Sequence, residues 1–417
     1  MIPKHVIDTA RSVGLSAVMR GAGKITRFLP IPQPTLLVGP GASARLGHAI
    51  AGFGHKKILI VTDGIISKLG LLNTLTTALT EGGSEFAVFD KITPDAPIPL
   101  IEEGIEFYKA NHCDAIVAFG GGSSMDASKT IAVAVANNKS PSQLAGYFRG
   151  FRNPITIYAV PTTAGTGSEV TVAAVVSNPA THKKLVIVDT RIVPKMAALD
   201  PELMTGLPPH VTSTTGMDAL THAVEAYIGN NWNTPYSDAM ALSAVSMIYE
   251  NLPIAYKDGK NLAAREQMAL ASTYAGFAFT RANVGYVHAI AHQFGGKYHT
   301  PHGLANAIML PYVLRFYGAA VTDKLAVLAV RARLGEESES NEVLAEKFMA
   351  SVEAMNRELG IPEHLEALRE QDIPALAKAA CWEAHTGYPV PRYMSPEVCE
   401  DIIRKALPKK GGKKAAK

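Results

Sequence analysis

Histidine and aspartate residues in the second half of the chain are spaced in a way that could hold a metal ion. Asp218 and His222 are four positions apart, as are His288 and His292, and His302 follows a proline soon afterwards. Residues four apart on a helix project from the same face. One aspartate and three histidines that converge in space would form a mixed oxygen and nitrogen site for a divalent first-row metal, with a position open for substrate.

The alternative to a metal site is a set of ordinary helix contacts. One histidine pair at this spacing is more often a satisfied structural pair, whereas two pairs and a histidine after a proline favour metal binding. Iron or zinc would suit the site, and the lack of cysteine among these residues argues against a structural zinc centre. A non-catalytic metal-binding scaffold is a further alternative, which would bind metal without binding a cofactor.

A glycine-rich turn in the first half predicts a site for nucleotide phosphates. The apolar run 115–119 ends in three glycines and two serines at 120–124 and then passes into a helical stretch. Glycines let the backbone approach a ligand closely, and the free amides of the following helix favour a pyrophosphate. A glycine cluster alone could be only a tight turn, but strand, glycines and helix in this order favour the nucleotide site. The dinucleotide fingerprint with spaced glycines is absent after the first strand, so this is not a standard Rossmann domain.

Two other segments could contact a nucleotide. Asp63 follows an apolar run, where its carboxylate could accept a bond from a ribose hydroxyl and would repel a 2′-phosphate, which favours NAD over NADP. A helix or turn cap is an equally good interpretation of Asp63. Residues 161–169 follow another apolar run with small hydroxylated residues and glycines, and such a loop can wrap a nucleotide closely.

The elements around these motifs fall into two groups. Short apolar runs that alternate with helical stretches predict a parallel sheet flanked by helices, with strands at 35–38, 57–62, 86–89, 114–119 and 155–160. Helices are expected at 66–79, 97–110 and 124–135, and residues 170–176 and 184–189 resemble a hairpin or edge pair beside the sheet. From 211 to 407 the segments are long, rich in alanine and leucine and divided by glycine or proline, so this half should be nearly all helix.

The expected fold class is therefore an α/β dinucleotide-binding domain with a parallel, Rossmann-like but non-standard sheet, followed by an all-α metal-binding domain. We place an N-terminal extension at 1–33, the nucleotide domain at 34–205, the helical domain at 206–407 and a lysine-rich tail at 408–417. The tail cannot bury apolar surface, so we expect it to be disordered.

Composition excludes several classes of protein. The formal net charge is +3, but five lysines at positions 409–417 contribute +5 to it. The rest of the chain therefore has no excess of positive charge, which argues against binding to polyanions such as nucleic acid. No stretch is long and apolar enough for a membrane helix, and three scattered cysteines suit a reducing compartment. We expect a cytoplasmic protein. The basic residues of the N-terminal extension are also compatible with a mitochondrial transit peptide.

These motifs, in this order, resemble those of the iron-containing, or group III, alcohol dehydrogenases, which include lactaldehyde reductase, propanediol dehydrogenase and butanol dehydrogenase. The resemblance covers about residues 34 to 405 and implies an architecture like that of dehydroquinate synthase. It is carried by the segments 120–129, 161–169, 216–222, 288–292 and 301–303.

The resemblance also implies roles for individual residues. Asp218, His222, His288 and His302 look like the four metal ligands, and His292 looks like the family's non-ligand catalytic histidine. The residues similar to cofactor contacts, in and around the glycine-rich turn, are Asp63, Gly121, Gly122, Ser123, Asp126, Thr162, Thr163, Thr166 and Lys184. Phe279 and His385 resemble positions that line the substrate pocket. His385 precedes Thr386 and Gly387, where some relatives carry a cysteine, and Ser124 stands where many carry proline, so the pocket is expected to differ in shape from theirs.

The expected reaction is hydride transfer between a primary alcohol or small diol and NAD, with Fe²⁺ or another divalent ion such as Zn²⁺ lowering the pKa of the alcohol. The nearest alternatives on the same fold are a hydroxyacid-oxoacid transhydrogenase and a glycerol-type polyol dehydrogenase. A lyase of the dehydroquinate synthase type is more distant, since its basic phosphate-binding cluster is not evident. Relatives are commonly dimers or larger, and the strand near Thr35 could pair across a subunit interface.

Overall fold

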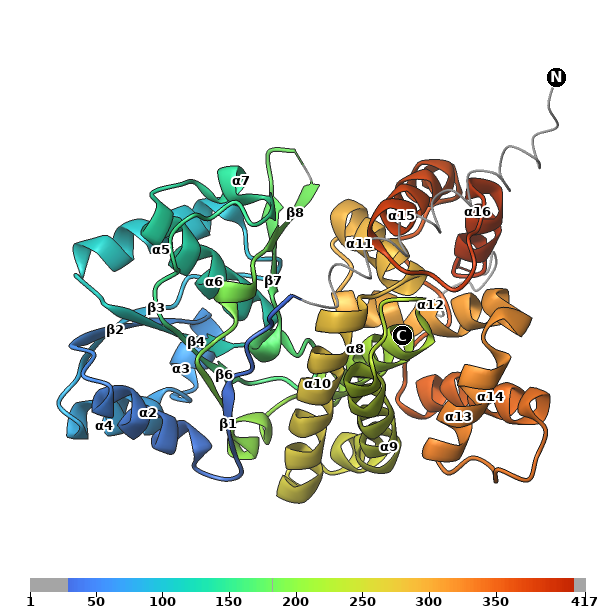
Figure 1. Ribbon diagram of the computed structural model, residues 1–417, viewed down its shortest axis with the longest axis horizontal. Helices are drawn as coiled ribbons and strands as arrows, with labels where there is room; N and C mark the ends of the chain where they lie inside the picture. Colours follow the sequence, from blue (N-terminus) through green and yellow to red (C-terminus); the bar gives the residue numbers. More distant parts are fainter. Residues whose placement is uncertain (1–28, 182, 409–417) are drawn as a thin grey trace, which may run out of the picture.

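The computed structural model describes residues 29–181 and 183–408, and the chain folds into a sheet-containing part followed by a helical part (Figure 1). The predicted fold class is confirmed. The lysine tail that we expect to be disordered lies almost entirely in residues 409–417, which are outside the described residues. Most of the N-terminal extension, residues 1–28, is outside them as well.

A six-stranded parallel sheet forms the first part. Its strands are β1 (Thr35–Val38), β2 (Lys57–Val61), β3 (Glu85–Phe89), β4 (Ala115–Gly120), β6 (Ile157–Pro161) and β9 (Met196–Leu199), in the order β1-β9-β6-β4-β2-β3. Side chains alternate between the two faces of a strand. Ile58 and Ile60 therefore pack with α2 (Ala42–Gly52) and α4 (Asn73–Glu81), while Leu59 and Val61 pack with α5 (Ile98–Ala110) and α6 (Gly122–Asn137).

Some elements differ from the sequence-based expectation. The helix expected at 66–79 is divided into α3 (Gly64–Lys68) and α4, because the chain turns at Gly70, whose φ of 69° lies in the left-handed region. Strand β9 and the short strand β5 (Gly146–Tyr147) were not predicted. The sequence of β9, Met-Ala-Ala-Leu, contains no β-branched or aromatic residue, so its composition does not indicate a strand.

The expected hairpin is present and forms a sheet of its own. Strands β7 (Ala173–Asn178) and β8 (Lys183–Val188) are antiparallel, and β5 pairs with β8 to complete a three-stranded sheet. A short 3-10 helix, η1 (Ser168–Val170), connects the end of β6 to this hairpin, which lies between α6 and the helical part (Figure 1).

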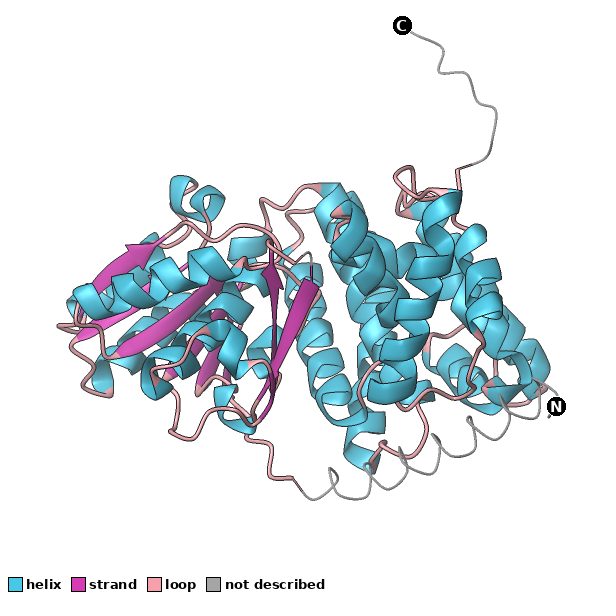
Figure 2. Cartoon of the chain, turned by 90° about the horizontal axis from the view of Figure 1, so that it is seen from above, coloured by secondary structure: helices cyan, strands magenta, loops and turns pink. Residues whose placement is uncertain are grey.

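The second part is helical throughout, as expected, and Figure 2 shows the strands confined to the other part of the molecule. Its α-helices are α8 (Pro209–Ile228), α9 (Pro235–Lys257), α10 (Leu262–Ala282), α11 (Tyr286–Tyr298), α12 (His302–Tyr317), α13 (Thr322–Arg331), α14 (Asn341–Glu358), α15 (Ile373–Gly387) and α16 (Pro396–Arg404). No helix among the described residues is both long and apolar enough to cross a membrane.

Candidate metal and coenzyme site

Four of the predicted residues meet in one buried cluster. Asp218 and His222 come from α8, His288 comes from α11, and His302 is the first residue of α12. One potential ligand atom from each residue lies within 4.8 Å of the others. The packing of α8, α11 and α12 thus brings together residues that are up to 84 positions apart, while His292, one turn after His288, stays outside the cluster.

Close packing between helices holds the cluster together. Pro301 has an extended backbone and is the N-cap of α12, so the helix begins at His302. A side chain at Gly303 would have its Cβ atom 2.3 Å from the carbonyl oxygen of Thr214, so only glycine lets α12 approach α8 this closely. The ring of Phe279 stacks on His222 with centroids 4.3 Å apart, which restrains that ligand from the other side.

The histidines of the cluster are held neutral. Burial lowers the pKa of His302 to about 3, lowers that of His288 well below its usual value, and lowers that of His222. Neutral rings present the lone pairs that a metal requires. The Nδ1 atom of His222 is also buried without a hydrogen-bond partner among the described residues. Three neutral imidazoles, one carboxylate and an unpartnered ring nitrogen fit a divalent first-row metal.

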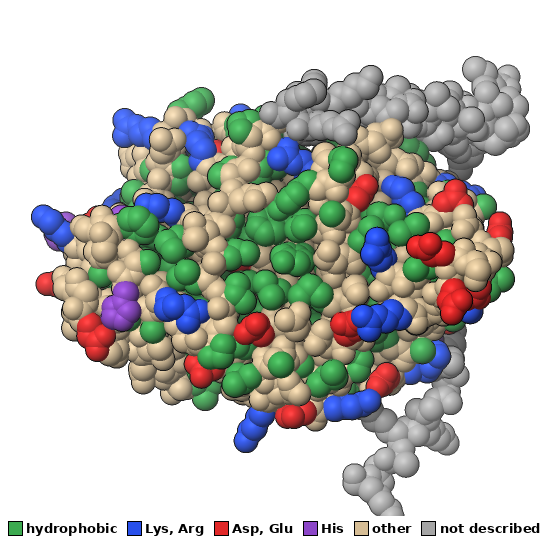
Figure 3. Space-filling model, turned by 60° about the horizontal axis from the view of Figure 1, so that its bottom comes forward, with side chains coloured by type: hydrophobic (Ala, Val, Ile, Leu, Met, Phe, Trp, Pro, Cys, Tyr) green, Lys and Arg blue, Asp and Glu red, His purple; other side chains and the backbone are tan. Residues whose placement is uncertain are grey.

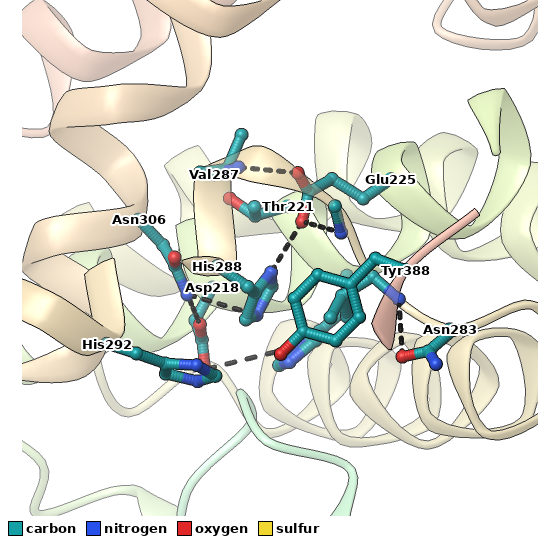
Figure 4. A network of polar contacts seen from close by, with 12 residues as sticks. Asp218, Thr221, Glu225, Asn283, Val287, His288, His292, Asn306 and Tyr388 are labelled. Atoms are coloured by element: carbon teal, nitrogen blue, oxygen red, sulfur yellow. Dashed lines mark hydrogen bonds and ion pairs between the residues drawn. The ribbon is translucent and has the colours of Figure 1, made fainter. Parts of the chain in front are cut away.

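Two residues that sequence reasoning missed support the ligands (Figure 4). Glu225 Oε2 lies 2.6 Å from Nδ1 of His288, and Asn306 Nδ2 donates to Oδ1 of Asp218 at 2.6 Å. Outer contacts of this kind fix the orientation of metal ligands. The spacing could have indicated both residues, because Glu225 follows His222 by three positions and Asn306 follows His302 by four, on the same helix faces.

The glycine-rich turn lies at the carboxyl end of β4, as predicted. The strand ends at Gly120 and α6 starts at Gly122, so the amides of the first turn of α6 are free at this edge. A Cβ atom at Gly122 would lie 2.8 Å from Cγ2 of Thr166, so the turn and the loop after β6 are in close contact. Gly121 and Thr163 are neighbours in the same way, and the amide of Thr162 donates to the carbonyl of Gly120.

A cleft of about 1830 Å³ joins this turn to the histidine cluster. Its lining includes most of the predicted residues from both parts of the molecule: Gly122, Ser123, Asp126, Thr166, Lys184, His222, Phe279, His288, His292, His302 and His385. The remaining cofactor candidates, Asp63, Gly121, Thr162 and Thr163, are not among the residues that line the cleft; they follow the carboxyl ends of β2, β4 and β6. A ligand along the glycine-rich turn can therefore reach the histidines.

Asp63 has the capping role that was weighed against nucleotide binding. Its Oδ1 atom accepts hydrogen bonds from the amides of Ile65 and Ile66 at 2.8 and 3.0 Å and so caps α3. Both capping bonds go to Oδ1. Capping and a contact from Oδ2 to a ribose are therefore compatible.

An ionic network joins the buried Lys129 to the partly buried Asp126 beside the glycine-rich turn. The carboxylate of Asp126 accepts bonds from Ser168 Oγ at 2.8 Å and from the amide of Val175 at 2.9 Å, and Lys129 donates to Ser168 Oγ and Thr171 Oγ1. Burial lowers the pKa of Lys129 to about 8, although the charge of Asp126 opposes this change. Asp126 thus ties η1 and the hairpin to α6 with both of its carboxylate oxygens.

Lys184 reaches into the cleft from the hairpin. Its Nζ atom lies 2.8 Å from Oδ1 of Asp95, and both side chains are partly buried. Asp95 and Ala96 have φ values of 68° and 45°, an unusual left-handed pair that turns this loop toward the hairpin. Lys184 also lies close to Gly295 of α11, so it is positioned where the two parts of the molecule face each other.

The strand–glycine–helix turn, which is typical of nucleotide sites, and the buried Asp/His cluster meet at one cleft. Together they define the class of the protein as a metal-dependent dehydrogenase. Two family models then match the chain, one described as iron-containing alcohol dehydrogenase over residues 33–201 and one as the C-terminal part of the Fe-containing alcohol dehydrogenase family over residues 212–407. The chain belongs to the iron-containing alcohol dehydrogenase family.

Similar proteins agree with this placement. The chain is 37% identical to the NAD-dependent methanol dehydrogenase of Bacillus methanolicus, over 91% of this chain and 99% of that protein. It is 40% identical to the 1,3-propanediol dehydrogenase of Citrobacter freundii, over 88% and 96% respectively. A crystal structure of a 1,3-propanediol oxidoreductase, 39% identical, superimposes with a TM-score of 0.88 and covers 91% of this chain and all of that one.

Proposed function

We propose that the protein interconverts short primary alcohols or small diols and their aldehydes, with NAD as the coenzyme and Asp218, His222, His288 and His302 as the metal ligands. The observation that carries the proposal is the shared cleft, because the glycine-rich turn of α6 and the neutral histidine cluster line the same cavity. Two similar proteins are named as a methanol dehydrogenase and a 1,3-propanediol dehydrogenase, and these names support this substrate class.

When bound at this site, a divalent metal would supply Lewis-acid activation of the alcohol, and a nicotinamide would supply the hydride acceptor. The protein's own residues do the positioning. The amides at the start of α6, with Gly121, Gly122, Ser123, Thr162, Thr163 and Thr166, are proposed to hold the pyrophosphate and adjoining ribose. Asp63 is proposed to select NAD, and Lys184 to approach the coenzyme from the hairpin. Asp126 is proposed to position this edge through its network.

The substrate is proposed to lie between the metal ligands and a partly aromatic wall. Phe279 and His385 line the cleft, and His385 is restrained by a 2.6 Å hydrogen bond between its Nε2 atom and the hydroxyl of Tyr286. His292 is proposed to receive the hydroxyl proton that the alcohol loses. The apolar walls exclude water from the reacting carbon, which protects hydride transfer.

We further propose that the chain assembles as a homodimer or a larger homo-oligomer. Strand β1 is an edge strand that pairs only with β9 among the described residues, so one side of it can pair with another chain. Figure 3 shows a face where apolar side chains gather centrally and charged side chains lie toward the rim, as at many subunit interfaces. A cytoplasmic location also belongs to the proposal, and the three buried, free cysteines support it.

The domain division at about residue 205 stays a prediction. The last strand, β9, ends at Leu199 and the first long helix, α8, begins at Pro209, which supports a boundary between them.

The test of the function is NADH formation by anaerobically purified, iron-loaded protein with methanol, longer primary alcohols, 1,3-propanediol, glycerol and 2-hydroxy acids, with NAD and NADP in parallel. Metal-dependent turnover of alcohols or diols with NAD is expected. Turnover that needs an oxoacid acceptor would favour the transhydrogenase instead, and a preference for glycerol would favour the polyol dehydrogenase. Metal binding without NADH binding would contradict the proposal altogether.

A further inference from the structure

His292 occupies a different position from the four clustered residues. It lies one helical turn after His288 on α11, and its ring stacks beside that of His302 with centroids 5.4 Å apart and planes 16° apart. It also lines the cleft. Its Nδ1 atom lies 2.5 Å from Oε1 of Glu383, a residue of α15 that is 91 positions away in the sequence.

Glu383 receives hydrogen bonds from three side chains. Besides its contact with His292, Oε1 accepts a bond from the hydroxyl of Tyr388 at 2.6 Å, and Oε2 accepts one from Nε2 of Gln293 at 2.9 Å. Burial raises the pKa of Glu383, but His292 and the three hydrogen bonds outweigh burial, so the net shift is downward. The carboxylate is therefore ionised at neutral pH and can only accept hydrogen bonds.

This geometry determines where the hydrogen of His292 resides. Because the carboxylate only accepts, Nδ1 of His292 must carry the hydrogen of the short contact, and in the neutral ring Nε2 is then a bare acceptor. No described residue hydrogen bonds to Nε2, and this atom is not among the buried unpartnered atoms. The free acceptor is accordingly accessible from the cleft. Figure 4 shows His292 beside the network that supports the ligand histidine.

We infer that Glu383 is a positioning residue for proton transfer: it holds His292 in the tautomer whose bare Nε2 atom faces the cleft. The inference rests on the proposed function. When the alcohol is oxidised to the aldehyde, the carbon gives up a hydride to the coenzyme and the hydroxyl gives up a proton. Nε2 accepts that proton and later releases it to water, and the reverse transfer serves aldehyde reduction. Glu383 stabilises the doubly protonated ring through its charge.

The central test replaces Glu383 by glutamine, which keeps the size of the side chain and removes its charge. The amide nitrogen of glutamine can donate to Nδ1, which would move the ring hydrogen to Nε2. We expect kcat to fall about a hundredfold, with metal content and the KM for NAD unchanged. Glu383→Asp keeps the charge and should recover part of kcat. Glu400→Gln, which neutralises an ion-paired carboxylate on the neighbouring helix α16, is the matched control and should keep wild-type kcat.

A second readout does not depend on turnover. Long-range proton–nitrogen correlation spectra of histidine-labelled, zinc-loaded protein report the tautomer of each ring, and the signal of His292 is assigned by its loss in His292→Asn. The wild type should show the hydrogen on Nδ1, and Glu383→Gln should change this pattern. Tyr388→Phe removes another donor to Oε1 and keeps the carboxylate, so it should keep the wild-type tautomer.

The outcomes separate the inference from the proposed function. If wild-type protein turns over no alcohol, the proposed function fails, while the spectra still test the tautomer. If Glu383→Gln keeps both kcat and the tautomer, the inference is wrong. Loss of metal or a general rise in KM in Glu383→Gln, with the tautomer unchanged, would assign Glu383 a structural role and also overturn the inference.

Discussion

The Nδ1 atom of His288 lies 2.6 Å from Oε2 of Glu225, and both side chains are almost completely buried. Glu225 also accepts hydrogen bonds from the amides of Gly285 and Val287, at 2.9 and 2.8 Å, at the start of α11. One carboxylate thus orients a proposed metal ligand and satisfies the free amides of the helix that carries it. When Nδ1 carries the ring hydrogen and donates to this carboxylate, Nε2 of His288 is the free acceptor on the side of the cluster, where Asn306 Nδ2 is 3.1 Å away.

Replacing Glu225 by glutamine should weaken metal binding. The single amide oxygen of glutamine cannot accept from His288, Gly285 and Val287 together, so the ligand ring loses its fixed orientation. We expect the dissociation constant for Zn²⁺ to rise about 10- to 100-fold, as measured by competition with a chromophoric chelator. Glu250→Gln changes a partly exposed carboxylate paired with Arg333 and serves as the control. Equal affinities in the two variants would contradict the role of Glu225.

Replacing Lys129 by methionine should destabilise the fold. The ammonium group is fully buried, and its loss removes the countercharge of the buried carboxylate of Glu169 and the nearer of the two lysines that act on the partly buried carboxylate of Asp126. Removing one partner of a buried ionic network costs about 3 to 5 kcal/mol. Denaturant titration measures the free energy of unfolding. Lys109→Met removes an exposed ion pair with Glu106 and should change it by less than about 1 kcal/mol; a similar small effect for Lys129→Met would refute the prediction.

Metal-free protein should lose stability as the pH falls. The pKa values of His222, His288 and His302 are lowered from 6.5 in the fold, to about 3 for His302. Below pH 6.5 the unfolded chain therefore binds protons at these three positions that the folded chain excludes, and the contribution of the three histidines to the free energy of unfolding decreases toward pH 3. Each histidine contributes up to about 1.4 kcal/mol per pH unit.

Denaturant titrations of the metal-free protein at about pH 7.5 and about pH 5.5 measure this dependence. His302→Asn should reduce the slope of unfolding free energy against pH, since asparagine does not titrate. His48→Asn changes an exposed histidine and should leave the slope as it is. A slope that is the same in all three proteins would show that the buried histidines do not control acid stability.

Replacing Asp63 by serine should relax the preference for NAD. A serine hydroxyl can still cap α3, so the fold is preserved, while the negative charge that would repel a 2′-phosphate is lost. We expect the ratio of kcat/KM for NADP to that for NAD to rise at least about tenfold. Steady-state kinetics with both coenzymes measure the ratio. An unfolding midpoint at the same denaturant concentration as in the wild type shows that the cap is kept. An unchanged ratio would leave Asp63 with capping alone.

The sequence predicted what depends on local spacing. The pair Asp218 and His222 lies on one helix face at four positions, and the strand–glycine–helix order around Gly121 is likewise local, so both could be inferred from the residues themselves. Strand β9 was missed because its alanines carry no strand signal, although burial between β1 and β6 makes it a strand. The break at Gly70 was missed because one glycine inside a helical pattern does not show whether the helix continues.

The contacts between distant elements were beyond prediction from spacing. Glu383 is 91 positions from His292, and Lys129 is 42 positions from the carbonyl of Thr171 that it contacts. Such contacts depend on how α15 packs on α11 and how the hairpin packs on α6, which no local pattern encodes. The grouping of His288 with the ligands on α8 came from family resemblance, since 66 positions separate it from His222.

All four clustered residues belong to the helical part, while the glycine-rich turn belongs to the sheet-containing part. Selection can therefore change the residues around the metal site without rebuilding the coenzyme site. A chimera that joins residues up to about 205 of this chain to the helical part of a relative should keep this chain's coenzyme preference and acquire the relative's alcohol preference. The surface that must stay matched in such an exchange includes the contact of α11 with the hairpin at Gly295 and Lys184. It also includes the contact of α10 with η1, where Thr273 Oγ1 donates to Oε1 of Glu169 at 2.7 Å. Variation in substrate range can thus accumulate independently of the redox partner.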